Sequence, residues 1–293
     1  MNTSQKLHRG TFGLGCFLFL GSIILARVFS YPHFYTWFAV GSWLILDWID
    51  YHKNGKSILG YFYNHKHRIA FFFFFFVATI TAFVIDYVYG VRLSNMWEWP
   101  AYSNIHFVRM YTIMNVAYIL GMYELFRVIR TYLKPYISDQ HKILFALKIK
   151  TRIALNITGI ILGIICVLVP LFVWYTGWAS QMKYLMLLPF IGMWLISDNI
   201  TSLLKGKSII SEIVRGNMLE ITSLITTVFL ATIVTEFINL YAHEWIYRYM
   251  PFENLLILGI PTAVFIGWIP LVIGVISLLN MVKHIDYLQH NKN

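Results

Sequence analysis

The chain has 293 residues, of which 58% are hydrophobic and only 12% are charged, and its formal net charge is +10. A soluble domain carries roughly twice that share of charged residues, so the composition excludes an ordinary soluble globular protein. The basic residues gather in alternate loops between apolar stretches, a pattern that sets membrane orientation and predicts no nucleic-acid partner.

Eight apolar stretches are long enough to cross a membrane, which predicts an all-α polytopic membrane protein. The expected spans are roughly 11–30, 33–50, 69–89, 105–126, 153–176, 182–200, 220–240 and 254–281. Because basic loops stay on the cytoplasmic side, both termini are predicted to be cytoplasmic, and a bacterial inner membrane is the expected location.

An internal repeat organises these spans. The stretch "GSWLILDWIDYHKNGKSILG", which begins at Gly41, aligns without gaps with "GMWLISDNITSLLKGKSIIS", which begins at Gly192. Each copy has four expected spans, so the copies are interpreted as two parallel four-helix repeats with a possible cavity between them. The predicted parts are a first repeat over 1–130, a basic cytoplasmic connector over 131–152 and a second repeat over 153–293.

Each copy carries a Gly-Lys-Ser triplet, at 55–57 and at 206–208. The triplet resembles the end of a phosphate-binding loop, but the upstream glycine of that motif is absent and no strand precedes it. A glycine turn between two helices, with the serine as an N-cap, is the better interpretation.

Histidines and repeated aspartates offer little support for a metal site. The two histidines of "NHKH", residues 64–67, are interpreted as solvated loop residues, and no HExxH or spaced histidine motif occurs. Asp47 and Asp198 are interpreted as helix-end aspartates beside basic loops. We therefore expect neither a metal nor a cofactor.

Two acidic residues near span ends are the main candidates for chemistry. Asp86 lies in "FVIDYVYGVRLSNMWEWP", residues 83–100, and Glu236 lies in "TEFINLYAHEWIYRYMP", residues 235–251. Such an acid tends to face the bundle or a wet cavity. Asp86 is expected to pair with Arg109. Glu236 has no expected cation, so an apolar setting would keep it protonated as a general acid, with Asn239 on the same helical face.

The order of apolar span, acid, W-x-[YW] and proline, present twice, resembles the small membrane-embedded lycopene cyclases and the related integral-membrane terpene cyclases. The resemblance implies a cyclase or isomerase that protonates an isoprenoid and shields the cation with aromatic rings. It implies catalytic roles for Asp86, Glu236 and Glu253. The implied ring lining is Trp97, Trp99, Trp245 and Tyr247, and Asn239 and Arg109 complete the predicted substrate-binding set.

Other interpretations remain open. The repeated phrase is also similar to a set of uncharacterised bacterial membrane proteins, which implies no function. Parallel repeats, a protonatable acid and a last span broken by proline and glycine also suit a transporter or lipid-binding protein. A non-catalytic scaffold, in which the acids only fix helix register, is the third alternative. The cyclase and the transporter interpretations both predict a lipid, isoprenoid or other small molecule as partner.

Overall fold

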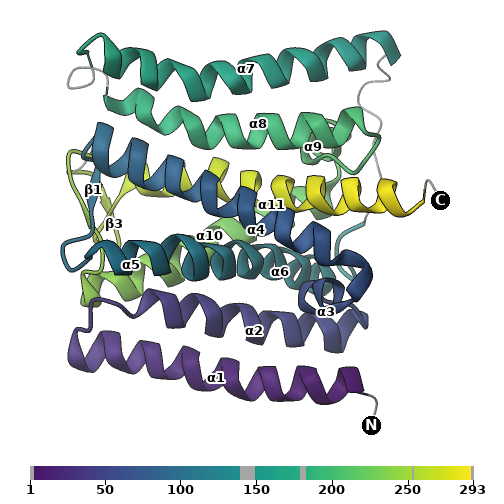
Figure 1. The fold of residues 1–293 in the computed structure, drawn as a ribbon, viewed down its shortest axis with the longest axis horizontal. Helices are drawn as coiled ribbons and strands as arrows, with labels where there is room; N and C mark the ends of the chain where they lie inside the picture. Colours follow the sequence, from purple (N-terminus) through teal and green to yellow (C-terminus); the bar gives the residue numbers. More distant parts are fainter. Residues whose placement is uncertain (1–2, 139–148, 179–182, 253, 292–293) are drawn as a thin grey trace.

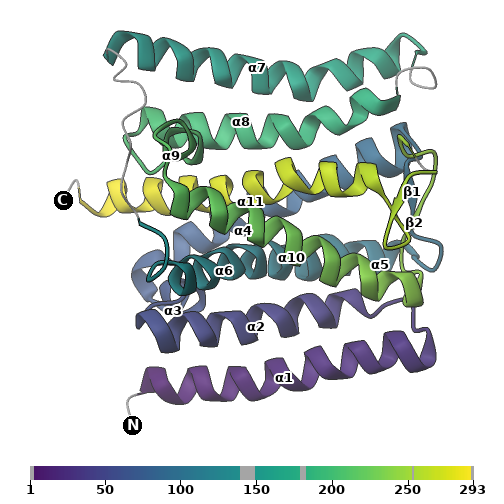
Figure 2. The same cartoon turned by 180° about the vertical axis from the view of Figure 1, so that it is seen from behind.

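The computed structural model describes residues 3–138, 149–178, 183–252 and 254–291. Nearly all of this chain is helical, and four two-residue strands form two small antiparallel pairs. The long helices run side by side, with α1 at one edge of the molecule and α7 at the other (Figure 1). Helices α4 and α10 lie on opposite faces, as Figures 1 and 2 together show.

The helical segments are α1 (Thr3–Phe29), α2 (Tyr35–Asn54), α3 (Ile58–Tyr63), η1 (His65–His67), α4 (Arg68–Ala82), η2 (Phe83–Leu93), α5 (Asn104–Arg109), η3 (Met110–Met114), α6 (Asn115–Leu133), α7 (Ile149–Tyr175), η4 (Lys183–Leu187), α8 (Leu188–Leu203), α9 (Ile209–Val214), α10 (Met218–Ala242) and α11 (Thr262–His290). The strands are β1 (Trp97–Glu98), β2 (Ile246–Tyr247), β3 (Leu256–Ile257) and β4 (Ile260–Pro261). Segments η2 and η3 are π-helical continuations of α4 and α5.

Six helices in the described chain are long and apolar enough to cross a membrane. They are His8–Phe29, His65–Leu93, Asn104–Leu133, Ile149–Tyr175, Met218–Ala242 and Thr262–His290. This is the architecture of an all-α, multi-pass membrane protein. Two expected spans are not among the six: α8 has only 16 residues, and α2 carries two aspartates and a lysine in its second half. Both nevertheless lie alongside the other helices, α2 between α1 and α6 and α8 between α7 and α11 (Figure 1).

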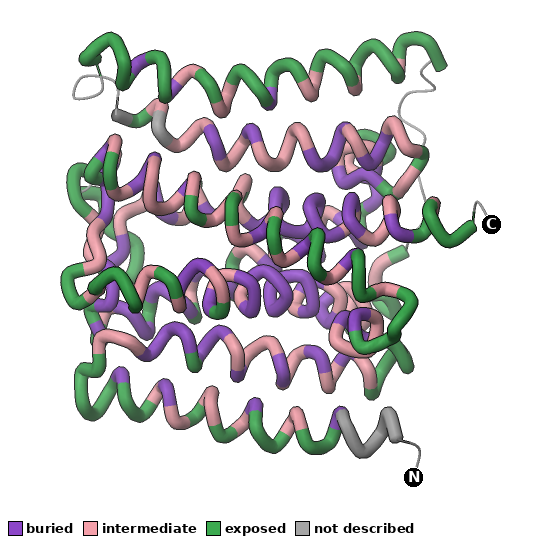
Figure 3. Tube along the Cα trace, viewed as in Figure 1, coloured by how far each residue is buried: buried purple, intermediate pink, exposed green. Residues whose placement is uncertain are grey.

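Burial is concentrated at the centre of the molecule. Helices α6 and α11 are largely buried, whereas α1 and α7 bury few residues (Figure 3). The outer helices expose large apolar side chains such as Phe17 and Phe172, which are 74% and 63% accessible. Apolar surface on this scale suits contact with lipid rather than water.

Glycine allows each outer helix to approach its neighbour closely. A Cβ atom at Gly41 of α2 would lie 2.9 Å from the carbonyl oxygen of Gly15 in α1. A Cβ atom at Gly192 of α8 would lie 2.7 Å from the carbonyl oxygen of Gly163 in α7. Small residues at helix crossings are a common packing device in membranes, and here they join α1 to α2 and α7 to α8 in the same way.

The molecule has two distinct ends. Helix α1 begins and α11 ends at the same end, on the right in Figure 1, which we call the terminal end. The strands lie at the opposite end, which we call the β end. The two Gly-Lys-Ser loops lie at the terminal end, where they lead into α3 and α9.

The expected N-caps in these loops are confirmed. The Ser57 hydroxyl accepts a hydrogen bond from the Gly60 amide at 3.1 Å, and the Ser208 hydroxyl accepts one from the Ser211 amide at 3.2 Å. Gly55 adopts a left-handed conformation with φ of 67°, as a glycine turn requires. In the second loop the expectation is wrong in detail, because Lys205 and not Gly206 has the positive φ, of 65°.

The aspartates before these loops brace them. Asp47 accepts a hydrogen bond from the Leu59 amide at 2.8 Å, and Asp198 accepts one from the Ile210 amide at 2.9 Å. The interpretation of both as helix-end aspartates therefore agrees with the structure.

The expected span at 254–281 is misplaced. The chain first forms a tight β3–β4 hairpin through Gly259, whose φ is 80°, and the helix α11 begins only at Thr262. Pro251 and Pro261 each remove an amide donor, which disfavours a helix through this segment. Part of the predicted connector, residues 139–148, lies outside the described chain.

Candidate functional site

A strand pair at the β end joins segments far apart in the sequence. Trp97 of β1 faces Tyr247 of β2, and the Arg248 amide donates to the Met96 carbonyl at 2.7 Å. The side chain of Asn239 holds the turn between α10 and β2, because its amide donates to the Trp245 carbonyl at 2.8 Å and its oxygen accepts from the Trp245 amide at 3.2 Å. Asn239 is therefore a brace for the loop and not part of a cavity wall.

Asp86 lies in the π-helical segment η2 and is held by two ring donors. The Trp97 indole donates to Oδ1 at 2.8 Å and the Tyr111 hydroxyl donates to Oδ2 at 2.7 Å. Both oxygens of this carboxyl group therefore accept a hydrogen bond. π-Helical turns are rare and occur often at functional sites, which draws attention to this one.

Glu236 occupies the corresponding place in α10. The Tyr247 hydroxyl donates to Oε1 at 2.6 Å, and the Trp268 indole of α11 donates to the same oxygen at 3.1 Å. Both bonds thus go to one oxygen. Glu236 and Asp86 differ by 150 in residue number, and so do their ring donors Tyr247 and Trp97.

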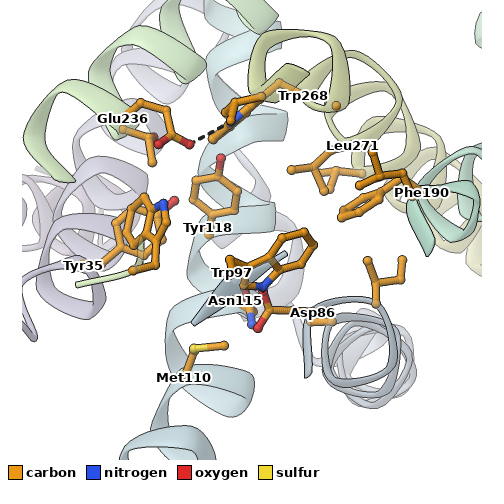
Figure 4. Close-up of a pocket in the computed structure, with 18 of the residues that line it drawn as sticks. Tyr35, Asp86, Trp97, Met110, Asn115, Tyr118, Phe190, Glu236, Trp268 and Leu271 are labelled. Carbon is orange, nitrogen blue, oxygen red and sulfur yellow. Dashed lines mark hydrogen bonds between the residues drawn. The ribbon is translucent and has the colours of Figure 1, made fainter. Parts of the chain in front are cut away.

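Both acids line one cavity of about 190 Å³, whose walls come from several helices and from the strand pair (Figure 4). Most of the wall is apolar or aromatic. The aromatic lining residues are Tyr35, Trp97, Trp99, Tyr118, Phe190, Trp245, Tyr247 and Trp268, and the polar ones besides the acids include Thr81, Asn115 and Thr235. No ion pair among the described residues involves either Asp86 or Glu236, so neither carboxyl group has a basic side chain as its partner there.

The structure brings together six of the nine predicted site residues. Asp86, Glu236, Trp97, Trp99, Trp245 and Tyr247 all line the cavity. Asn239 and Arg109 do not, and Glu253 lies outside the described residues.

Four aromatic residues of the wall were not predicted from the sequence. They are Tyr35, Tyr118, Phe190 and Trp268, which come from α2, α6, α8 and α11. The sequence could have indicated two of them, because Tyr118 and Trp268 are separated by 150 positions, as Asp86 and Glu236 are.

The expected Asp86–Arg109 ion pair is wrong. Tyr111, two residues after Arg109, supplies the hydrogen bond to Asp86 instead. The charge of Arg109 acts on a neighbouring group, the buried carboxyl of Glu244, which accepts hydrogen bonds from the Tyr35 amide at 2.7 Å and from the Tyr102 hydroxyl. Arg109 therefore belongs to a polar cluster beside the cavity, and its position is explained by Glu244 rather than by Asp86.

Burial dominates the titration of the groups in this polar cluster. It raises the pKa of Glu244 to about 7, although the bonds from Tyr102 and Tyr35 and the charge of Arg109 act in the opposite direction. Burial, together with the charges of His106 and Arg109, lowers the pKa of His33 to about 4. Glu244 therefore titrates near neutral pH at the β end.

One group of described residues has the composition of a metal site. His67, Asp286 and His290 place their ligand atoms within 4.8 Å of one another at the terminal end. The expectation of a solvated loop is wrong for His67, because its Nδ1 lies 2.5 Å from Asp286 Oδ2. The same oxygen accepts from the Tyr61 hydroxyl, so the carboxylate is already satisfied by protein donors.

Comparisons with known proteins found no match, so a function must be inferred from the architecture and the cavity. No protein-family model matches the chain, no curated protein matches it, and no solved structure matches it.

Proposed function

We propose that this protein is a membrane-embedded cyclase or isomerase of an isoprenoid, with the cavity between α10, α11, η2 and the strand pair as its active site. The observation that carries the proposal is the placement of two carboxyl groups, Asp86 and Glu236, in one aromatic cavity, where neither forms an ion pair with a described basic side chain. The two groups differ in how they are bound, which allows different roles.

Glu236 is proposed as the acid. Its two donors both bind Oε1, which leaves Oε2 to carry a proton. A buried charge without a partner is costly, so a proton on this carboxyl group suits its surroundings. Transfer of that proton to a carbon–carbon double bond gives a carbocation, and the faces of Trp97, Trp99 and Trp245 can stabilise it.

Asp86 is proposed as the base. Donors on both of its oxygens stabilise a carboxylate. After the double bond attacks the cation and a ring closes, or after a simple shift of the double bond, loss of a proton to Asp86 ends the reaction. One proton enters and one leaves, so the product is an isomer of the substrate. The cavity of about 190 Å³ accommodates one end of a long isoprenoid chain.

The proposed setting is a duplicated membrane domain with eight helices in the membrane. Support comes from matched contacts that recur about 150 positions apart: the acids and their ring donors at 150, the serine caps at 151 and the glycines of the helix crossings at 148 and 151. A pseudo-twofold axis that passes through the Trp97–Tyr247 pair, along the membrane normal, relates the repeats. The positive-inside pattern places both termini in the cytoplasm.

The experiment compares the lipid extracts of cells that accumulate linear isoprenoids and express either the wild type or the Glu236→Gln variant. Glutamine keeps the shape of the side chain and removes its acidity. The matched control is Glu98→Gln, because Glu98 is an exposed glutamate of β1 outside the cavity wall. We expect a cyclised or isomerised product from the wild type and from Glu98→Gln, and none from Glu236→Gln at an equal protein level.

A non-catalytic role would give a different result. If the cavity only binds an apolar molecule, the three extracts contain the same isoprenoids, and the molecule copurifies unchanged with the wild type. Identical extracts would therefore refute the cyclase, while copurification would support a lipid-binding or transport function.

A further inference from the structure

A second cavity lies at the terminal end, and its chemistry is opposite to that of the first. Its volume is about 530 Å³. It shares no lining residue with the aromatic cavity. Its walls include hydroxyl, amide and basic side chains, among them Tyr51, Tyr61, Asn64, Tyr123 and Asn280.

The two Gly-Lys-Ser loops meet at this cavity. Lys56, from the loop after α2, and Lys207, from the loop after α8, both line it. The loops are held in the same way, by the serine N-caps and by the aspartate bonds from Asp47 and Asp198. The two lysines are thus presented by turns that share the serine and aspartate bonds, although the left-handed residue is Gly55 in the first turn and Lys205 in the second.

The wall carries more positive than negative charge. Five basic side chains line the cavity against a single carboxylate, and the five are Lys56, Arg127, Arg130, Lys207 and Lys283. The carboxylate is Glu220, which already receives Arg130 at 2.9 Å and Lys207 at 2.8 Å. Arg127 forms an ion pair at 2.9 Å with Asp50, which does not line the cavity.

Two of the lysines have no carboxylate partner among the described residues. Lys56 forms no ion pair there, and Lys283 instead donates to the Tyr123 hydroxyl at 3.2 Å. Glu124 is close to Arg127 but is occupied by the Ile58 amide at 2.5 Å. The cavity therefore contains two lysine ammonium groups, those of Lys56 and Lys283, that no carboxylate of the described chain neutralises.

We propose that this cavity binds a phosphate group. Lysine recognises phosphate as a compact charge and arginine recognises it by paired hydrogen bonds, and both types are present here. The group can belong to a soluble phosphorylated compound or to the headgroup of an anionic phospholipid, and the recognition chemistry is shared. This site is separate from the proposed active site and does not depend on the proposed reaction.

The test measures the thermal unfolding midpoint of the purified full-length protein in neutral detergent with and without pyrophosphate, at matched ionic strength with chloride. The test variant is Lys56→Gln combined with Lys207→Gln. The control is Lys66→Gln, an exposed lysine at the same end of the molecule that does not line the cavity. We expect pyrophosphate to raise the midpoint by several degrees in the wild type and the control, and by much less in the double variant.

Nanodiscs distinguish the two sources of the phosphate. The same three proteins are compared in phosphatidylcholine discs and in discs that contain phosphatidylglycerol. Stabilisation by phosphatidylglycerol that disappears in the double variant supports a lipid headgroup, and stabilisation by pyrophosphate alone supports a soluble ligand. Equal responses of all three proteins to both probes, or no response of the wild type to either, would overturn the proposal.

Discussion

Two carboxyl groups at matching places in the chain have diverged in side chain and in partners. Asp86 receives an indole and a phenol on separate oxygens, whereas Glu236 receives both donors on one oxygen. The first donors, Trp97 and Tyr247, occupy equivalent positions, but the second do not, because Tyr111 corresponds to Pro261 and Trp268 corresponds to Tyr118. Small differences of this kind can assign an acid and a base to equivalent positions.

Glu244 gives a prediction about pH. Its pKa of about 7 in the folded protein exceeds its ordinary value of 4.5, so between these values the folded state holds a proton that the unfolded state has lost. The free energy of unfolding should therefore fall as pH rises from about 4.5 to about 7, by at most about 3 kcal/mol from this residue.

The measurement compares thermal midpoints at pH 5 and pH 8 for the wild type, Glu244→Gln and Glu98→Gln. We expect the loss of stability toward pH 8 to shrink in Glu244→Gln, because glutamine cannot ionise. The half-exposed Glu98, which pairs with Arg248 at 2.6 Å, provides the control for the loss of one carboxyl group at the same end of the molecule. An unchanged pH dependence in Glu244→Gln would show that this carboxyl group does not titrate in that range.

At the scale of elements, the packing of η2 against β1 positions Asp86. A Cβ atom at Gly90 of η2 would lie only 1.8 Å from the Trp97 ring, so the glycine makes room for the indole that binds Asp86. At the positions 150 residues later the chain has Leu240 and Tyr247. A glycine therefore accompanies tryptophan in the first segment, and a larger residue accompanies the smaller tyrosine ring in the second.

This pairing predicts the effect of Gly90→Ala. The added methyl group must displace the Trp97 ring, and overpacking of a buried site costs about 1–3 kcal/mol. We expect a lower thermal midpoint for Gly90→Ala. A smaller loss is expected for Gly90→Ala combined with Trp97→Tyr, because the smaller ring relieves the clash.

The control for Gly90→Ala is Gly13→Ala in α1, where a Cβ atom would meet nothing within 4 Å. It should leave the midpoint unchanged or raise it slightly, since alanine favours a helix. If Gly90→Ala were as stable as Gly13→Ala, the close packing of η2 on β1 would not be needed.

The pattern of apolar spans and the internal alignment predicted the all-helical membrane architecture, both acids of the cavity and four of its aromatic lining residues. They worked because aligned residues in the two segments are separated by about 150 positions, which is how Asp86 and Glu236 could be matched. The rotation of each helix about its own axis, which decides the side chains that face the cavity, was harder to predict. An apolar helix has no clear polar face, so its sequence did not show that Tyr111 rather than Arg109 turns toward Asp86.

At the scale of the whole molecule, the two ends have opposite surroundings. The β end carries the aromatic cavity with two acids and the terminal end carries the basic cavity. The basic end is expected to face the cytoplasm.

Labelling with a membrane-impermeant maleimide tests this orientation. In a chain with Cys16 and Cys166 replaced by serine, Glu98→Cys at the β end should react in intact cells. Tyr136→Cys, at a site that is 85% exposed near the terminal end, should react only after lysis. Reaction of Tyr136→Cys in intact cells would show that the terminal end faces outward, which is the opposite orientation.

The Trp97–Tyr247 strand pair has a consequence for the history of the chain. Trp97 and Tyr247 occupy equivalent positions in the two aligned segments and face each other in this pair. A symmetric homodimer of a single repeat would make the same contact. In such an ancestor every substitution would appear twice, and the two acids would have to remain identical. If the chain is the duplication that we propose, fusion of the two genes removes that restriction, and each copy can acquire its own acid, ring and glycine while the strand pair keeps them together.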